Sequence, residues 1–168
     1  MLVRVTRPDD IAALAGIERS AAQAFLQLPG LAWLANGDAL DDAVHWSCLA
    51  MGCSWVAESA QGQLSGFVCA SLQNLALHIE ELSVLREAQG QGIGRQLLDQ
   101  VVRAARQRAI PEVTLTTFMD VPWNSPFYAR YGFTVIAEQD LGERLRSLLA
   151  SEHAHGLTGR CAMRLLVG

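Results

Sequence analysis

A glycine-rich turn between a strand pattern and a helix pattern constrains this chain more than any other feature. Residues 82–98 read LSVLREAQGQGIGRQLL, with glycine at positions 90, 92 and 94. Glycines this close together leave a run of backbone N–H groups uncovered by Cβ atoms. The N-terminus of the following helix adds four unpaired N–H groups and partial positive charge. Phosphate groups bind at such junctions, so we expect the turn to hold the pyrophosphate of a nucleotide-containing cofactor.

The spacing of the glycines excludes two common nucleotide sites. A dinucleotide fingerprint reads G-x-G-x-x-G, and an acidic residue follows about 20 positions later at the end of a second strand. Here the glycines run G-x-G-x-G, and Glu112 begins a strand pattern instead of ending one. The G-K-[ST] of an ATP-type phosphate loop is absent as well. On these residues alone, the start of a helix in any α/β domain is an equal alternative.

The turn resembles the acetyl-CoA motif of the GCN5-related N-acetyltransferase (GNAT) family, [Q/R]-x-x-G-x-[G/A]. Gln89, Gly92 and Gly94 occupy its three fixed places, although Arg is the commoner first residue. A second stretch, residues 123–133 with the sequence WNSPFYARYGF, resembles the later family motif, in which an Asn precedes a helix ending Y-x-x-x-G-F. It follows the turn by one helix and one strand, as in the family. The resemblance implies an N-acetyltransferase, an acyltransferase with acetyl-CoA as its cosubstrate.

The same resemblance implies which residues contact the cofactor. The backbone of Leu82 to Val84 would lie beside the pantetheine arm in the manner of an added strand, and the N–H of Leu82 would stabilise the oxyanion. Asn124 would hydrogen-bond the arm, although a helix cap is an alternative reason for Asn at this position. The expected cofactor-binding residues are Leu82, Ser83, Val84, Gln89, Gly90, Gln91, Gly92, Ile93, Gly94, Arg95, Asn124 and Tyr128.

Acetyl transfer from a thioester to an amine needs a deprotonated amine, a donor for the oxyanion and a proton for the leaving thiolate. Tyr128 matches the general acid of the family, and an aromatic ring packed beneath a short helix is the alternative. Strand alternation puts His78 and Glu80 on one face. Glu80 is the candidate base, directly or through water, and His78 is the candidate relay. A polar face along an open cleft is the alternative for both.

Three aromatic residues, Phe25, Trp33 and Trp123, are candidate walls of the acceptor pocket, with core packing as the alternative. The formal charge of −4 and the Glu80 face indicate a small cationic amine as substrate, and the negative charge argues against a nucleic-acid partner. A protein or peptide N-terminal acetyltransferase remains an alternative, as does a noncatalytic acetyl-CoA-binding regulatory module. The family also includes many dimers, so a homodimer is consistent with the resemblance.

The length of 168 residues predicts one domain over residues 1–168. The resemblance implies an α/β fold of the α+β type, with a mixed, mostly antiparallel central sheet of about seven strands flanked by helices. No apolar run is long enough to span a membrane and no signal-peptide pattern is visible, so we expect a cytoplasmic protein without membrane contact. Four cysteines without C-x-x-C spacing indicate buried thiols in a reducing compartment, and no metal site is assigned.

Three expected element boundaries bear on the site. Asp38 is the expected N-cap of a second helix. The amphipathic helix that follows the glycine turn is expected to begin after Gly94, and Phe133 to Ala137 is expected to form a strand.

Overall fold

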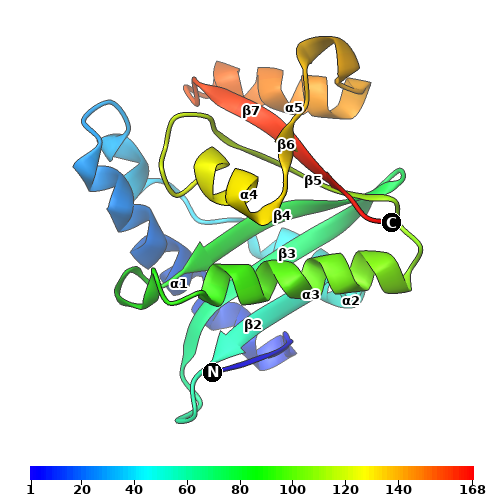
Figure 1. Ribbon diagram of the computed structural model, residues 1–168. Helices are drawn as coiled ribbons and strands as arrows, with labels where there is room; N and C mark the ends of the chain where they lie inside the picture. Colours follow the sequence, from blue (N-terminus) through cyan, green and yellow to red (C-terminus); the bar gives the residue numbers. More distant parts are fainter. The chain divides into compact units, whose positions relative to one another are not determined.

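The computed structural model describes residues 1–168, which form seven strands and five α-helices (Figure 1). The strands are β1 (Leu2–Val5), β2 (Ser54–Glu58), β3 (Leu64–Gln73), β4 (Ala76–Val84), β5 (Glu112–Phe118), β6 (Thr134–Val135) and β7 (Arg160–Leu166). The helices are α1 (Ile11–Ala22), α2 (Asp42–Ala50), α3 (Ile93–Gln107), α4 (Ser125–Tyr131) and α5 (Glu143–Ala154).

The strands form one sheet in the order β1-β2-β3-β4-β5-β7-β6. The β1–β2, β2–β3, β5–β7 and β6–β7 pairs are antiparallel, and the β4–β5 pair is parallel. This confirms the expected mixed, mostly antiparallel sheet of seven strands.

The chain divides into two compact units. The first unit contains Met1–Leu72 and Ile79–Ala104, and the second contains Gln73–His78 and Ala105–Gly168. Strand β4 and helix α3 therefore contribute residues to both. The single domain expected from the chain length stays a prediction.

The core of the first unit forms where α1 and α2 cover one face of β2 and β3. Because side chains alternate along a strand, Phe67 and Cys69 of β3 point to the same face, and both are fully buried there. The cluster consists of Ile11, Leu14, Ile17, Cys48, Val56, Phe67 and Cys69. It holds the backbone of β3 rigidly beneath the two helices.

On β3, Gly66 allows α3 to approach the strand closely. A Cβ atom at Gly66 would lie 3.0 Å from the carbonyl oxygen of Ser83 and 3.3 Å from side-chain carbons of Ile93 and Leu97. Only glycine fits without displacing these neighbours. This packing places the first turn of α3 directly against β3.

Helix α2 begins later than the sequence predicts, so the assignment of Asp38 as its N-cap is wrong. Asp41 is the N-cap, and its side chain accepts the N–H of Ala43 at 3.0 Å. The carboxylate of Glu18 on α1 accepts the N–H of Leu40 at 2.9 and 3.1 Å through its two oxygens. That bond ties the segment before Asp41 to α1 in a non-helical conformation.

The second unit is built on β5 and β7, which pair from Glu112 with Leu166 to Phe118 with Arg160, and α5 runs beside β7 (Figure 1). Strand β6 is shorter than expected, because Phe133 lies in the C-terminal cap that follows α4, and Ile136 and Ala137 lie beyond the strand. The N–H of Phe133 donates to the carbonyl of Tyr128 at 3.0 Å, and its side chain is buried.

Candidate active site

The glycine turn has the backbone conformation that its sequence demands. Gly90 and Gly92 have φ angles of +77° and +82°, in the left-handed region that favours glycine. No atom lies within 4 Å of the position that a Cβ would take at either residue. The turn therefore presents its backbone to open space.

Helix α3 begins at Ile93, so the expectation that it starts after Gly94 is wrong. The carbonyl of Gly92 already accepts the N–H of Gln96 at 3.1 Å, which places Gly92 at the N-cap and Gly94 in the first turn. The unpaired N–H groups of the helix thus begin directly at the second left-handed glycine.

The side chain of Gln89 braces the turn. Its amide nitrogen donates to the carbonyl of Val84 at 3.1 Å, and its oxygen accepts from the guanidinium of Arg86 at 3.4 Å. The N–H of Arg86 donates to the hydroxyl of Ser20 on α1 at 3.0 Å. Gln89 therefore joins the turn to the end of β4.

The end of β4 offers its backbone more than its side chains. The register between β4 and β5 includes only Ala76 to His78, so Leu82 to Val84 lie outside it. Ser83 is buried and its hydroxyl donates to the carboxylate of Glu81 at 2.8 Å. The side chain of Ile93 is also buried. Any ligand beside these residues would meet mainly their N–H and C=O groups.

Glu80 is half-buried in the first unit and is held by a hydroxyl group on the neighbouring strand. Ser71 on β3 donates to Oε1 of Glu80 at 2.5 Å. The sequence analysis missed Ser71. No local sequence signal identifies it, because Ser71 lies three residues before Asn74 and Glu80 lies six residues after it.

His78 lies in the second unit and is only 2% exposed. Its Nδ1 atom is 2.9 Å from the hydroxyl of Thr114, its partner in the β4–β5 register. Burial, followed by the positive charge of Arg144, lowers the pKa of His78 to about 4. The imidazole is therefore neutral near pH 7.

Asn124 occupies the N-cap position of α4, but its side chain makes no cap hydrogen bond. Its carboxamide oxygen accepts the hydroxyl of Thr117 at 2.7 Å and the N–H of Phe118 at 3.3 Å. Because a backbone N–H only donates, the atom facing it must be the oxygen. The amide NH₂ group is thus directed away from β5. Asn124 is the N-cap residue of α4 by position, as the helix-cap alternative predicted, but its side chain does not cap the helix.

Tyr128 is half-buried on α4, one helical turn after Asn124, whose carbonyl accepts the Tyr128 N–H at 3.1 Å. Its ring packs edge-on against Phe127 and Phe133, with ring centroids 5.1 and 5.7 Å apart. Such contacts fix the plane of the ring. These contacts agree with the alternative that the Tyr128 ring packs beneath a short helix. Its role as the general acid stays a prediction.

The three aromatic residues expected at the acceptor pocket are not core residues. Trp33 is 50% exposed on a 3₁₀ helix (Ala32–Asn36), where the sequence predicted a loop. Phe25 and Trp123 are half-buried. Phe25 and Trp33 lie in the first unit and Trp123 in the second.

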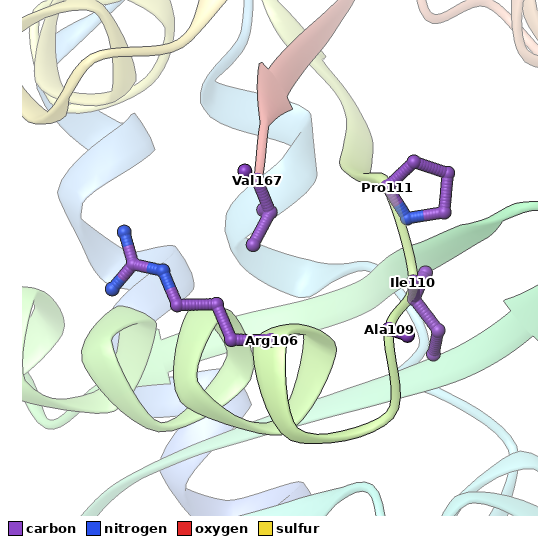
Figure 2. Close-up of a pocket in the computed structure, with 6 residues that line it drawn as sticks. Arg106, Ala109, Ile110, Pro111 and Val167 are labelled. Atoms are coloured by element: carbon purple, nitrogen blue, oxygen red, sulfur yellow. The ribbon is translucent and has the colours of Figure 1, made fainter.

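A cavity of about 400 Å³ lies in the second unit, where the end of α3 and the start of β5 face the end of the chain (Figure 2). Its lining residues are Arg106, Ala109, Ile110, Pro111, Val167 and Gly168. None of them is an expected site residue, and Arg106 is the one charged side chain among them. The cavity therefore adds no acid, base or nucleophile to the candidate site.

No group of three or more His, Cys, Asp or Glu side chains is arranged to hold a metal ion. None of the helices is both long enough and apolar enough to cross a membrane.

Solved structures of low sequence identity share this fold. Rv2747 from Mycobacterium tuberculosis, solved with CoA, is 20% identical with a TM-score of 0.70, and the match covers 100% of both chains. N-acetylglutamate synthase from Neisseria gonorrhoeae, solved with CoA and N-acetyl-glutamate, is 17% identical with a TM-score of 0.72. That match covers 99% of this chain and 35% of the synthase. The ribosomal-protein-S18-alanine N-acetyltransferase from Escherichia coli is 14% identical with a TM-score of 0.69, over 99% of this chain and 94% of that one.

A family model described as the acetyltransferase (GNAT) family matches residues 22–133, more than half of the chain. The match includes the glycine turn, Glu80, Asn124 and Tyr128, so it covers both motifs that carried the resemblance. The chain belongs to the acetyltransferase (GNAT) family and is an acyltransferase.

Proposed function

We propose that this protein transfers an acetyl group from the thioester of acetyl-CoA directly to a primary amine of a small molecule. The observation that carries the proposal is the left-handed turn at Gly90 and Gly92, which opens directly onto the N-terminus of α3. No atom lies within 4 Å of the Cβ position at either glycine, and a helix N-terminus at such a turn suits the pyrophosphate of CoA. The CoA bound to Rv2747 and to N-acetylglutamate synthase supports the same cosubstrate here.

The rest of the cofactor would be held by backbone groups and one amide. Leu82 to Val84 lie outside the β4–β5 register, so their N–H and C=O groups suit the amides of the pantetheine arm. The NH₂ group of Asn124, directed away from β5, would donate to a carbonyl of the arm. The N–H of Leu82 would donate to the oxyanion that forms on the thioester carbonyl.

In the proposed reaction, Glu80 takes a proton from the amine, directly or through one water molecule. The amine nitrogen attacks the carbonyl carbon, the C–N bond forms, and the C–S bond breaks. The hydroxyl of Tyr128 gives its proton to the leaving thiolate, and solvent restores both groups. Each proton transfer of this kind typically contributes ~10²–10⁴-fold in rate. His78, buried and neutral, is assigned no proton transfer and serves to join β4 to Thr114 of β5.

The acceptor class rests on charge and on the site carboxylate. A net charge of −4 and the half-buried Glu80 favour a cationic amine of small size. Among the similar folds, one enzyme is an N-acetylglutamate synthase and another is a ribosomal-protein N-acetyltransferase. The test of function must therefore include both small amines and peptide N-termini.

The experiment measures CoA thiol release from acetyl-CoA with panels of amines, amino acids and peptides. Wild-type protein should turn over at least one small amine above the hydrolysis background. Tyr128→Phe and Glu80→Gln should each lower kcat by about 10²-fold or more, because each removes one proton transfer. Binding of CoA without turnover of any acceptor would instead identify a regulatory binding module. Unchanged turnover in Tyr128→Phe would remove Tyr128 from the mechanism.

A further inference from the structure

We infer that Ser71 is a positioning residue for the reaction, acting through Glu80, an inference that rests on the proposed role of Glu80 as the base. The Ser71 hydroxyl donates to Oε1 of Glu80 at 2.5 Å, the length of a strong hydrogen bond to a charged acceptor. No sequence motif includes Ser71.

Ser71 lies on β3, the strand that contributes Phe67 and Cys69 to the core of the first unit. It continues the row formed by Phe67 and Cys69 on one face of β3, and both of those side chains are fully buried in the core cluster. His45 on α2 packs edge-on against Phe67, with ring centroids 5.2 Å apart. The backbone that carries Ser71 is therefore anchored, and a serine hydroxyl has only one torsion to its oxygen. A donor held in this way has a nearly fixed position.

Glu80 needs such a partner because its own side chain is long. Three torsions separate its carboxylate from the backbone, and the group is only half-buried. A base must come within about 2.6–3.2 Å of the atom whose proton it takes, and a misplacement of about 1 Å can cost 10²-fold in rate. A carboxylate is planar, so fixing Oε1 against Ser71 limits where Oε2 can point. The hydrogen bond thereby selects one orientation of the base.

A purely structural role would produce a different result. If the bond only joined β3 to β4, its loss would lower stability and affect catalysis no more than any other strand–strand bond. Ser65 provides the comparison, because it lies six residues earlier on β3, about 20 Å away, and its hydroxyl donates to the carbonyl of Ala57 at 3.3 Å. Ser65 is also buried and has no part in the proposed site.

The experiment is a double-mutant cycle of Ser71→Ala and Glu80→Gln, read as kcat and as KM for acetyl-CoA. Ser71→Ala should lower kcat by about 10- to 100-fold and leave KM for acetyl-CoA unchanged. Combined with Glu80→Gln, it should lower kcat little further, since the base it positions is already absent. Ser65→Ala should keep the wild-type kcat.

A second pair of variants distinguishes the loss of the hydroxyl from misfolding of the protein. Ser71→Thr and Ser71→Val have nearly the same shape and both suit a strand, but only threonine retains the hydroxyl. Ser71→Thr should recover most of the activity, and Ser71→Val should not. The inference is overturned if the two variants are equally active, or if Ser71→Ala costs as much in the Glu80→Gln background as alone. A wild-type kcat in Glu80→Gln alone would show that Glu80 is not the base. That result would contradict the proposed function and would also remove the reason for the inference about Ser71.

Discussion

At the scale of single residues, burial of His78 makes the stability of the protein depend on pH. The side chain of His78 is 2% exposed, and burial with the charge of Arg144 lowers its pKa to about 4. In an unfolded chain a histidine titrates near 6.5. Between pH 6.5 and 4 the unfolded chain therefore binds more protons than the folded one. The stability contributed by neutral His78 is present above pH 6.5 and is lost as the pH falls through this window.

The variant His78→Asn tests this effect. Asparagine can replace the contact of Nδ1 with Thr114 but does not titrate. Between pH 7 and pH 4, the free energy of unfolding of the wild type should fall more steeply than that of the variant, with a difference of about 3 kcal/mol. Urea unfolding at a series of pH values measures it. Parallel pH curves for the two proteins would show that His78 is not held neutral.

Buried His45 does not interfere with that comparison. Burial lowers its pKa as well, and neither ring nitrogen has a hydrogen-bond partner. His45 contributes equally to the free energy of unfolding of the wild type and of His78→Asn, so it cancels in the difference between them. Because of His45, the stability of the variant still depends on pH.

Hydroxyl groups from neighbouring strands hold the polar residues of the candidate site, and the sequence did not reveal them. Ser71 donates to Glu80 in the first unit, and Thr117 donates to Asn124 in the second. Strand alternation supplied Glu80, and the second family motif supplied Asn124, because both signals are local in the sequence. The partners of Glu80 and Asn124 depend on strand register and on a turn geometry that local sequence patterns do not determine.

At the scale of elements, the glycine turn joins two requirements in one segment. Gly90 and Gly92 need left-handed backbone, and the N–H groups that they expose need open space in front of them. A β-branched side chain at Gly92 would violate both requirements. It would strain the turn and would occupy the space proposed for the phosphates.

Gly92→Val should therefore lower the affinity for CoA by about 100-fold or more, equivalent to about 2.8 kcal/mol. Gly159→Val is the matched control, because Gly159 is also exposed, has a φ of +74° and has no atom within 4 Å of its Cβ position. Both variants should lose similar stability, but only the first should lose CoA affinity in a calorimetric titration. Unchanged CoA affinity in Gly92→Val would contradict the proposed position of the pyrophosphate.

Element boundaries were predictable where a local signal ends the element. Strand β2 (Ser54–Glu58) is an example, because an apolar run ends there at the turn residues Ala60 to Gln63. The start of α2 was not predictable, because it depends on a hydrogen bond from the N–H of Leu40 to the carboxylate of Glu18. These two residues are 22 positions apart in the sequence. Phe133 was expected in a strand because its side chain is apolar, but its N–H bonds to the carbonyl of Tyr128, which places Phe133 in the C-terminal cap of α4.

At the scale of the whole molecule, the distribution of nucleophiles favours direct transfer. The four cysteines are free thiols and all are buried, as the sequence predicted. The chain contains no lysine, since all 13 of its basic residues are arginine. An acetyl-enzyme intermediate would require an accessible nucleophile activated by a neighbouring base, and these two residue types do not supply one. The acetyl group should therefore pass from CoA to the amine in a single ternary complex.

The mixed, mostly antiparallel sheet of about seven strands was predictable because the family resemblance implies it, whereas the strand order and the parallel pair β4–β5 were not predicted. The division into two compact units was not predictable, because β4 and α3 are continuous in the sequence pattern and contribute to both units. The acceptor stays a prediction, and the sequence indicates only its charge. Phe25 and Trp123 are half-buried and Trp33 is exposed, and their residue types do not identify one amine.

The most direct test of the account varies acetyl-CoA and the accepted amine together in steady-state kinetics. Direct transfer from the thioester to the amine requires both substrates to be bound at once, so double-reciprocal plots should intersect. Mass spectrometry of the protein after incubation with acetyl-CoA alone should find the intact chain without an added acetyl group. Parallel lines, together with an acetylated residue in the protein, would show a covalent intermediate and would contradict the proposed mechanism.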